Sequence, residues 1–156
     1  MPTTKSSFPN PLGRLISIPP ATEPFQRIWI DFLGRFLISR LGNKWIVVCT
    51  DYSTRYAVTR TLPTATASDV AKFMLEDIIL RHGAPRVLIT DRGQVFQSVF
   101  TSELIKLCNV THWMTTAYHP QTNGLTERIN KAEMLSMYVE VEQKNFDEIL
   151  PFVTFA

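Results

Sequence analysis

The chain has 156 residues, of which 45% are hydrophobic and 19% charged, and its formal net charge is +2. This length and composition are typical of one globular domain, and the length is too small for two. The small net charge does not by itself indicate a polyanionic partner such as nucleic acid. No apolar run approaches the roughly 18 residues of a membrane-spanning helix, so we expect no membrane partner.

Residues 1–24 are rich in proline and show no apolar periodicity. Proline lacks a backbone donor and holds the chain extended, so this stretch is predicted to be a linker or tail. The folded domain is then predicted over residues 25–156.

Three segments rich in β-branched and aromatic residues follow one another closely and predict strands. They are RIWIDFLGRFLI (27–38), KWIVVCTD (44–51) and RYAVTRTL (55–62). The turn residues LGN (41–43) separate the first two. Because the connections are short, an antiparallel meander of three strands is expected.

A helix is predicted directly after the third strand. Thr66 and Asp69 have the spacing of a capping box, and Gly83 followed by Pro85 would end the helix. The apolar side chains expected to pack on the sheet recur at helical spacing and are Val70, Phe73, Met74 and Ile78.

The second half of the chain predicts a return to the same sheet. RVLIT (86–90) is a continuous apolar run, which is typical of a buried parallel strand reached through a helical crossover. A fifth strand is expected around HWMTTA (112–117), and a helix is expected from the Gly124 loop to about Glu142. Between the two strands a second helix would point these side chains inward: Phe100, Leu104, Leu107 and Cys108.

This order of elements predicts an α/β fold with a five-stranded mixed sheet and helices on both faces. The ribonuclease-H-like fold has the same order, although other mixed α/β folds share it at this level of detail.

Asp31 is unusual because it lies in the middle of the first predicted strand, between Ile30 and Phe32. Aspartate is a poor strand residue, and burial of its charge is unfavourable unless something compensates. An arginine, backbone donors or a metal ion could do so, and for a single aspartate a structural salt bridge is the commonest explanation.

Asp91 and Glu127 are two further carboxylates in suggestive positions. Asp91 directly follows RVLIT, at the carboxyl end of a predicted parallel strand, where α/β sheets place their ligands. Glu127 lies near a predicted helix start, and thirty-five residues separate it from Asp91. Taken singly, Asp91 could cap a turn and Glu127 could favour the helix dipole. Together with Asp31 they can converge at one sheet edge, where divalent cations would relieve their repulsion.

Three segments in order, WIDFLG, TDRGQVFQS and TTAYHPQTNGLTERINK, resemble the D,D-35-E signature of retroviral and retrotransposon integrases, most closely the Ty3/gypsy type. The similarity covers roughly residues 24–156. It implies a ribonuclease-H-like polynucleotidyl transferase that uses two Mg²⁺ or Mn²⁺ ions. Asp31 would bridge both ions, and Asp91 and Glu127 would each complete one site.

The resemblance also implies partners and a place of action. The chain would trim the DNA ends of the element and join them to target DNA, as a homo-oligomer made in the cytoplasm and acting in the nucleus. Lys131, one helical turn after Glu127, would contact the DNA end, although a solvated lysine is a serious alternative. Asn123 and Gly124 would contact DNA near the scissile bond.

The sequence departs from this family in ways that leave alternatives open. The N-terminal zinc-binding module of the family is absent, and the chain stops in the apolar run PFVTFA, so we expect a core that is truncated at its C-terminal end. An inactive remnant that binds nucleic acid without catalysis is the first alternative. A nuclease of the ribonuclease H type is the second, but HPQTNGLTER favours an integrase.

A shortened helix is expected to reduce stability. Gypsy-type chains usually read NKTLADMLSMYV where this chain reads NKAEMLSMYV, and a loss of two residues rotates everything downstream by about 200°. We predict a higher melting temperature and a higher soluble yield when Thr-Leu-Ala-Asp replaces Ala132 and Glu133. Equal values for the two versions would show that the helix tolerates the shorter spacing.

Overall fold

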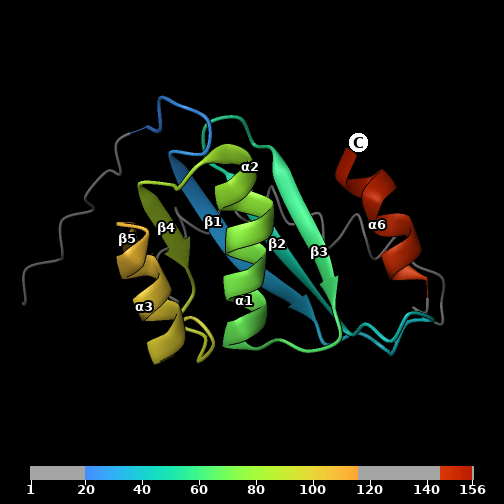
Figure 1. The fold of residues 1–156 in the computed structure, drawn as a ribbon. Helices are drawn as coiled ribbons and strands as arrows, with labels where there is room; N and C mark the ends of the chain where they lie inside the picture. Colours follow the sequence, from blue (N-terminus) through green and yellow to red (C-terminus); the bar gives the residue numbers. More distant parts are fainter. Residues whose placement is uncertain (1–19, 116–144, 156) are drawn as a thin grey trace, which may run out of the picture.

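The computed structural model describes residues 20–115 and 145–155, and these form a mixed sheet flanked by helices (Figure 1). The predicted linker up to residue 19 and the helix predicted after Gly124 lie outside the described residues. The strands of the described part are β1 (Arg27–Gly34), β2 (Trp45–Asp51), β3 (Ala57–Leu62), β4 (Val87–Thr90) and β5 (Thr111–Met114).

The sheet has the order β3-β2-β1-β4-β5. β2 pairs antiparallel with both β1 and β3, whereas β4 is parallel to β1 and β5 is parallel to β4. The predicted meander and the five-stranded mixed sheet are therefore confirmed. The parallel pairing of β1 with β4 places two strands from distant parts of the chain side by side, so that side chains near their carboxyl ends can meet.

The crossover from β3 to β4 is one helical segment in three parts: α1 (Ala67–Phe73), the π-helical stretch η1 (Met74–Ile79) and α2 (Leu80–His82). The predicted capping box is present, since the Thr66 hydroxyl accepts a hydrogen bond from Asp69 N at 3.2 Å and Asp69 Oδ2 accepts one from Thr66 N at 3.0 Å. The helical segment ends at Gly83, whose φ of 89° suits glycine. The four apolar side chains predicted to face the sheet are all buried.

Helices cover both faces of the sheet. Ile28 and Ile30 of β1 pack in the core beneath α1 and α3 (Val99–Leu107). On the other face, Ile46 of β2 packs against Phe146 and Leu150 of α6 (Phe146–Phe155). Because successive strand residues face opposite sides, β1 and β2 each contribute to both clusters.

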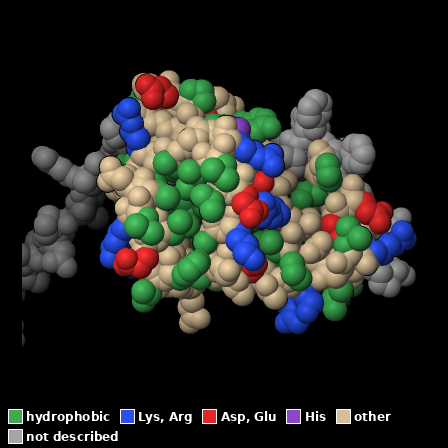
Figure 2. All heavy atoms as spheres, in the orientation of Figure 1, with side chains coloured by type: hydrophobic (Ala, Val, Ile, Leu, Met, Phe, Trp, Pro, Cys, Tyr) green, Lys and Arg blue, Asp and Glu red, His purple; other side chains and the backbone are tan. Residues whose placement is uncertain are grey.

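The inward face predicted for the second helix is confirmed in part, because Leu104 and Cys108 pack against the core but Phe100 and Leu107 do not. Phe100 and Leu107 of α3 are 58% and 84% exposed, and Thr101 and Ile105 are buried instead. The physical reason is that Thr101 donates its hydroxyl to the Val95 carbonyl at 2.9 Å, so this polar side chain can be buried on the inward face while Phe100 and Leu107 lie outward. Hydrophobic side chains accordingly appear on the surface over α3, and also over the crossover helix, where Leu75 of η1 and Leu80 of α2 are exposed (Figure 2).

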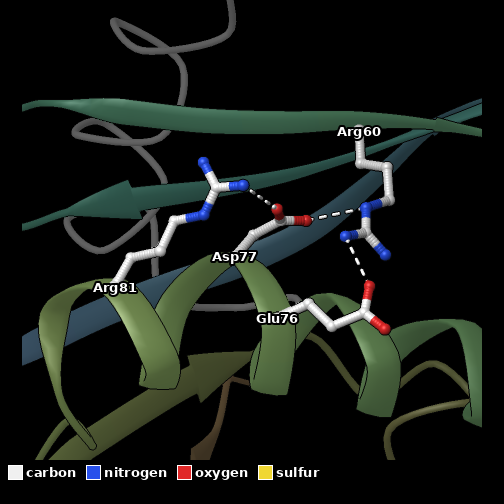
Figure 3. Close-up of polar contacts among 4 residues, drawn as sticks. All are labelled: Arg60, Glu76, Asp77 and Arg81. Carbon is white, nitrogen blue, oxygen red and sulfur yellow. Dashed lines mark hydrogen bonds and ion pairs between the residues drawn. The ribbon is translucent and has the colours of Figure 1, made fainter.

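An ion-pair cluster joins β3 to the crossover helix (Figure 3). Asp77, which is only 7% exposed, lies between two arginines: Arg60 Nε is 2.7 Å from Asp77 Oδ2, and Arg81 Nη2 is 3.6 Å from Oδ1. Arg60 also contacts Glu76, with 2.8 Å between Nη2 and Oε2. These contacts hold the helix against the sheet edge that lies farthest from β4.

Candidate active site

Asp31 is the fifth residue of β1. Ile30 faces the core beneath α1, so the alternation of the strand turns Asp31 to the opposite face, the one that α6 covers. Its Oδ1 accepts a hydrogen bond from Phe32 N at 2.8 Å. The side chain is partly buried. A backbone donor thus compensates one oxygen of this strand carboxylate.

Asp91 follows the last residue of β4 directly. The parallel register pairs Trp29 with Ile89, and its continuation by two residues sets Asp91 beside Asp31. Asp91 Oδ1 accepts a hydrogen bond from Gly93 N at 2.8 Å, which closes a tight turn after the strand. The structure therefore brings the two strand-borne aspartates together, as their positions in the sequence predict.

The electrostatics of Asp31 agree with this geometry. Burial raises the pKa of Asp31 from 3.8 to about 6; the hydrogen bond from Phe32 N lowers it, and the negative charge of Asp91 raises it. Within the part of the chain that the structure describes, the second oxygen of each carboxylate has no hydrogen-bond or ion-pair partner. Two close carboxylates with free oxygens are a favourable place for a cation.

The donor set suits a hard divalent cation. Carboxylate oxygens are the ligands that Mg²⁺ and Mn²⁺ prefer, and a bound cation would offset both the burial of the Asp31 charge and its repulsion by Asp91, which together raise the pKa of Asp31. No cluster of three or more metal-ligating side chains occurs within residues 20–115 and 145–155. The third predicted carboxylate, Glu127, lies outside the described residues, as do the predicted DNA contacts Asn123, Gly124 and Lys131.

Two neighbours of Asp91 have no counterpart among the sequence predictions. Thr90 is fully buried, and its hydroxyl donates to the Asp91 carbonyl at 2.8 Å and lies 2.9 Å from His112 Nε2. Because threonine is an ordinary strand residue, Thr90 gives no signal in the sequence that it contacts Asp91. Only the pairing of β4 with β5, which sets Leu88 opposite His112, reveals that His112 is close.

The raised pKa of Asp31 predicts a pH-dependent stability. The folded chain holds the Asp31 proton more tightly than the unfolded chain, so the contribution of Asp31 to the free energy of unfolding falls as the pH rises from 3.8 to about 6 and stays lower above it. Asp31→Asn should therefore stabilise the metal-free protein by about 1–3 kcal/mol near pH 7.5, with allowance for partial exposure, and by much less near pH 4. Urea denaturation at both pH values measures this, and an equal effect at the two would contradict it.

Comparison with solved structures identifies the fold. The chain superimposes with a TM-score of 0.71 on a chain of the cryo-EM structure of the simian T-cell lymphotropic virus intasome in complex with PP2A regulatory subunit B56 gamma. The sequences are 19% identical, and the match covers 88% of this chain and 50% of that one. The five-stranded mixed sheet flanked by helices is thus of the ribonuclease-H-like type.

Comparison of sequences identifies the family. The model of the integrase core domain matches residues 21–120, and the chain belongs to this family. It is 28% identical over 133 residues to the retrovirus-related Pol polyprotein from transposon 412 of Drosophila melanogaster, and 32% identical over 117 residues to the Gag-Pol polyprotein of feline leukemia virus. The Tf2-3 polyprotein of Schizosaccharomyces pombe is 28% identical over 127 residues.

These matches cover 84%, 73% and 81% of this chain but only 11%, 7% and 10% of the respective relatives. The chain therefore corresponds to about a tenth of the length of the polyproteins it resembles. The resemblance to integrases inferred from the three motifs is confirmed, and a Ty3/gypsy-type origin agrees with the transposon polyproteins among the relatives. None of the described helices is both long and apolar enough to cross a membrane.

Proposed function

We propose that this chain is the catalytic core of a retrotransposon integrase, which transfers polynucleotide ends into target DNA. The observation that carries the proposal is the meeting of Asp31 and Asp91 at neighbouring parallel strands of an integrase core fold. The raised pKa of Asp31 supports it, because a shifted carboxyl pKa is common at functional sites and here has the second aspartate as one of its causes.

In this proposal Asp31, Asp91 and Glu127 hold two Mg²⁺ or Mn²⁺ ions. The bound ions would supply activation of the attacking oxygen and stabilisation of the leaving 3′ oxygen in an in-line displacement at phosphorus. Phe32 N and Gly93 N each hold one carboxylate oxygen, so that both aspartates present their second oxygen in a fixed direction.

The steps and partners belong to the same proposal. Water is the attacking group when the DNA ends of the element are trimmed at their 3′ ends, and the exposed 3′-OH is the attacking group in strand transfer. Lys131, Asn123 and Gly124 contact the DNA, and the chain acts as a homo-oligomer in the nucleus. The intasome among its structural relatives is consistent with an oligomer on DNA.

The competing function is that of a remnant that binds DNA without catalysis, which the shortened segment after Lys131 favours. A strand-transfer assay with labelled element ends, target DNA and Mn²⁺ separates the two. We expect joined product from the wild-type chain and a loss of at least about 100-fold in Glu127→Gln, since removal of a metal ligand disables the site. DNA binding without product would favour the remnant, and full activity in Glu127→Gln would exclude the proposed ligand set.

A further inference from the structure

Thr90 sits at the centre of a short hydrogen-bond chain that ends on Asp91. It is the last residue of β4, and its side chain is fully buried. Its hydroxyl donates to the Asp91 carbonyl oxygen at 2.8 Å. The same hydroxyl oxygen lies 2.9 Å from Nε2 of His112, which comes from the neighbouring strand β5. Two hydrogen bonds thus connect His112 of β5, Thr90 of β4 and the backbone of Asp91 just after β4.

The direction of the chain follows from the number of protons. A threonine hydroxyl has one proton, and that proton is directed at the Asp91 carbonyl. The hydroxyl must therefore accept from His112, which requires the tautomer with the proton on Nε2. His112 is partly buried, and burial lowers its pKa, which agrees with a neutral ring that has one N–H.

Asp91 has few other restraints. Its side chain is exposed, and its carboxylate accepts a hydrogen bond from Gly93 N at Oδ1. That contact fixes the carboxylate only relative to the backbone of the turn. The Thr90 hydroxyl fixes the backbone itself, because it holds the carbonyl that begins the turn. A side chain at position 93 would crowd the Asp91 carboxylate, since a Cβ there would lie 2.9 Å from Asp91 Oδ1.

We propose that Thr90 and His112 are a positioning pair that orients the Asp91 carboxylate for binding a divalent cation. The pair acts through Asp91 and does not touch the cation. The inference rests on the proposed function for the identity of the ligand, but the orientation of Asp91 can be measured without any ligand.

The first test is the affinity for Mn²⁺, measured by calorimetry on the whole chain. Thr90→Val keeps the shape and removes the hydroxyl, and His112→Leu removes the donor. Each should raise the Kd for Mn²⁺ by about tenfold, the usual effect of losing an outer hydrogen bond at a metal ligand. The conservative variants Thr90→Ser and His112→Gln retain a hydroxyl and an N–H donor, and they should restore the wild-type Kd.

A matched control separates positioning from a general loss of stability. Thr101 of α3 is also fully buried, and its hydroxyl also donates to a backbone carbonyl at 2.9 Å, but the acceptor is Val95 and not Asp91. Thr101→Val should therefore lower the melting temperature about as much as Thr90→Val and leave the Kd for Mn²⁺ unchanged. Equal losses of affinity in the two variants would overturn the proposal.

The second test needs no metal. Hydrogen exchange of the Gly93 amide reports how firmly Asp91 Oδ1 is held. We expect Thr90→Val to accelerate this exchange by about fivefold in the metal-free protein, as expected for the loss of one hydrogen bond, and Thr101→Val to leave it unchanged. Wild-type exchange in Thr90→Val would overturn the positioning pair. A wild-type chain that binds no Mn²⁺ would instead overturn the proposed function, and the exchange result would still decide the orientation of Asp91.

Discussion

Asp91→Asn should remove most of the thermal stabilisation that Mg²⁺ or Mn²⁺ gives to the wild-type chain. A cation that binds only the folded state at a hundred times its Kd stabilises it by about 2.7 kcal/mol, which for a chain of this size raises the melting temperature by about 5–10 °C. Asparagine keeps the shape of Asp91 and its acceptor for Gly93 N but loses the charge that attracts the cation. Thermal melts with and without the cation measure the difference.

The metal-free comparison makes this prediction sharper. Because Asp91 is one of the causes that raise the pKa of Asp31, its neutralisation should leave the metal-free chain equally stable or slightly more stable. Glu103→Gln is the matched control: it removes an exposed carboxylate on α3 and should leave the metal response intact. An undiminished metal response in Asp91→Asn would show that Asp91 is not a ligand.

Arg60→Leu should destabilise the fold by about 2–3 kcal/mol, because it removes the closest counter-charge of the buried Asp77. The value lies below that of a fully buried pair for two reasons. The Arg60 side chain is 29% exposed, and Arg81 remains 3.6 Å from the Asp77 carboxylate. Urea denaturation of the metal-free protein measures the change.

Two further variants test the cause. The double variant Arg60→Leu with Asp77→Leu should recover most of the loss, since no unpaired buried charge is left. Lys106→Leu breaks the exposed pair with Glu103, whose side chains are 73% and 59% exposed, and should change stability by less than about 1 kcal/mol. If Arg60→Leu were as mild as Lys106→Leu, the cluster would have no special role.

The elements that depend on local patterns could be predicted from the sequence. The meander, the capping box at Thr66 and the crossover to β4 each leave a periodic or a turn signal within a few residues. Asp31 and Asp91 could be placed for the same reason, because a charge inside a strand and a charge directly after one are visible in the sequence.

The remaining features depend on contacts between distant residues. The first strand ends at Gly34 rather than at residue 38. Gly34 has a φ of 134°, and a Cβ there would lie 2.8 Å from the Lys44 carbonyl oxygen, so this strand end requires glycine because of a contact with a distant residue. The Thr90–His112 contact requires the β4–β5 register, which no local pattern reveals. The inward face of α3 required knowledge that Thr101 finds an acceptor.

The parallel pairing of β1 with β4 has a kinetic consequence. Asp31 and Asp91 are sixty positions apart in the sequence, and they meet only after the whole crossover has closed a long loop. A cation cannot serve as an early template for such a site, because these two ligands are far apart until the chain has folded. The binding energy of the proposed cation would be gained late, on the native side of the folding barrier, so the cation should prolong the lifetime of the folded molecule without hastening its formation.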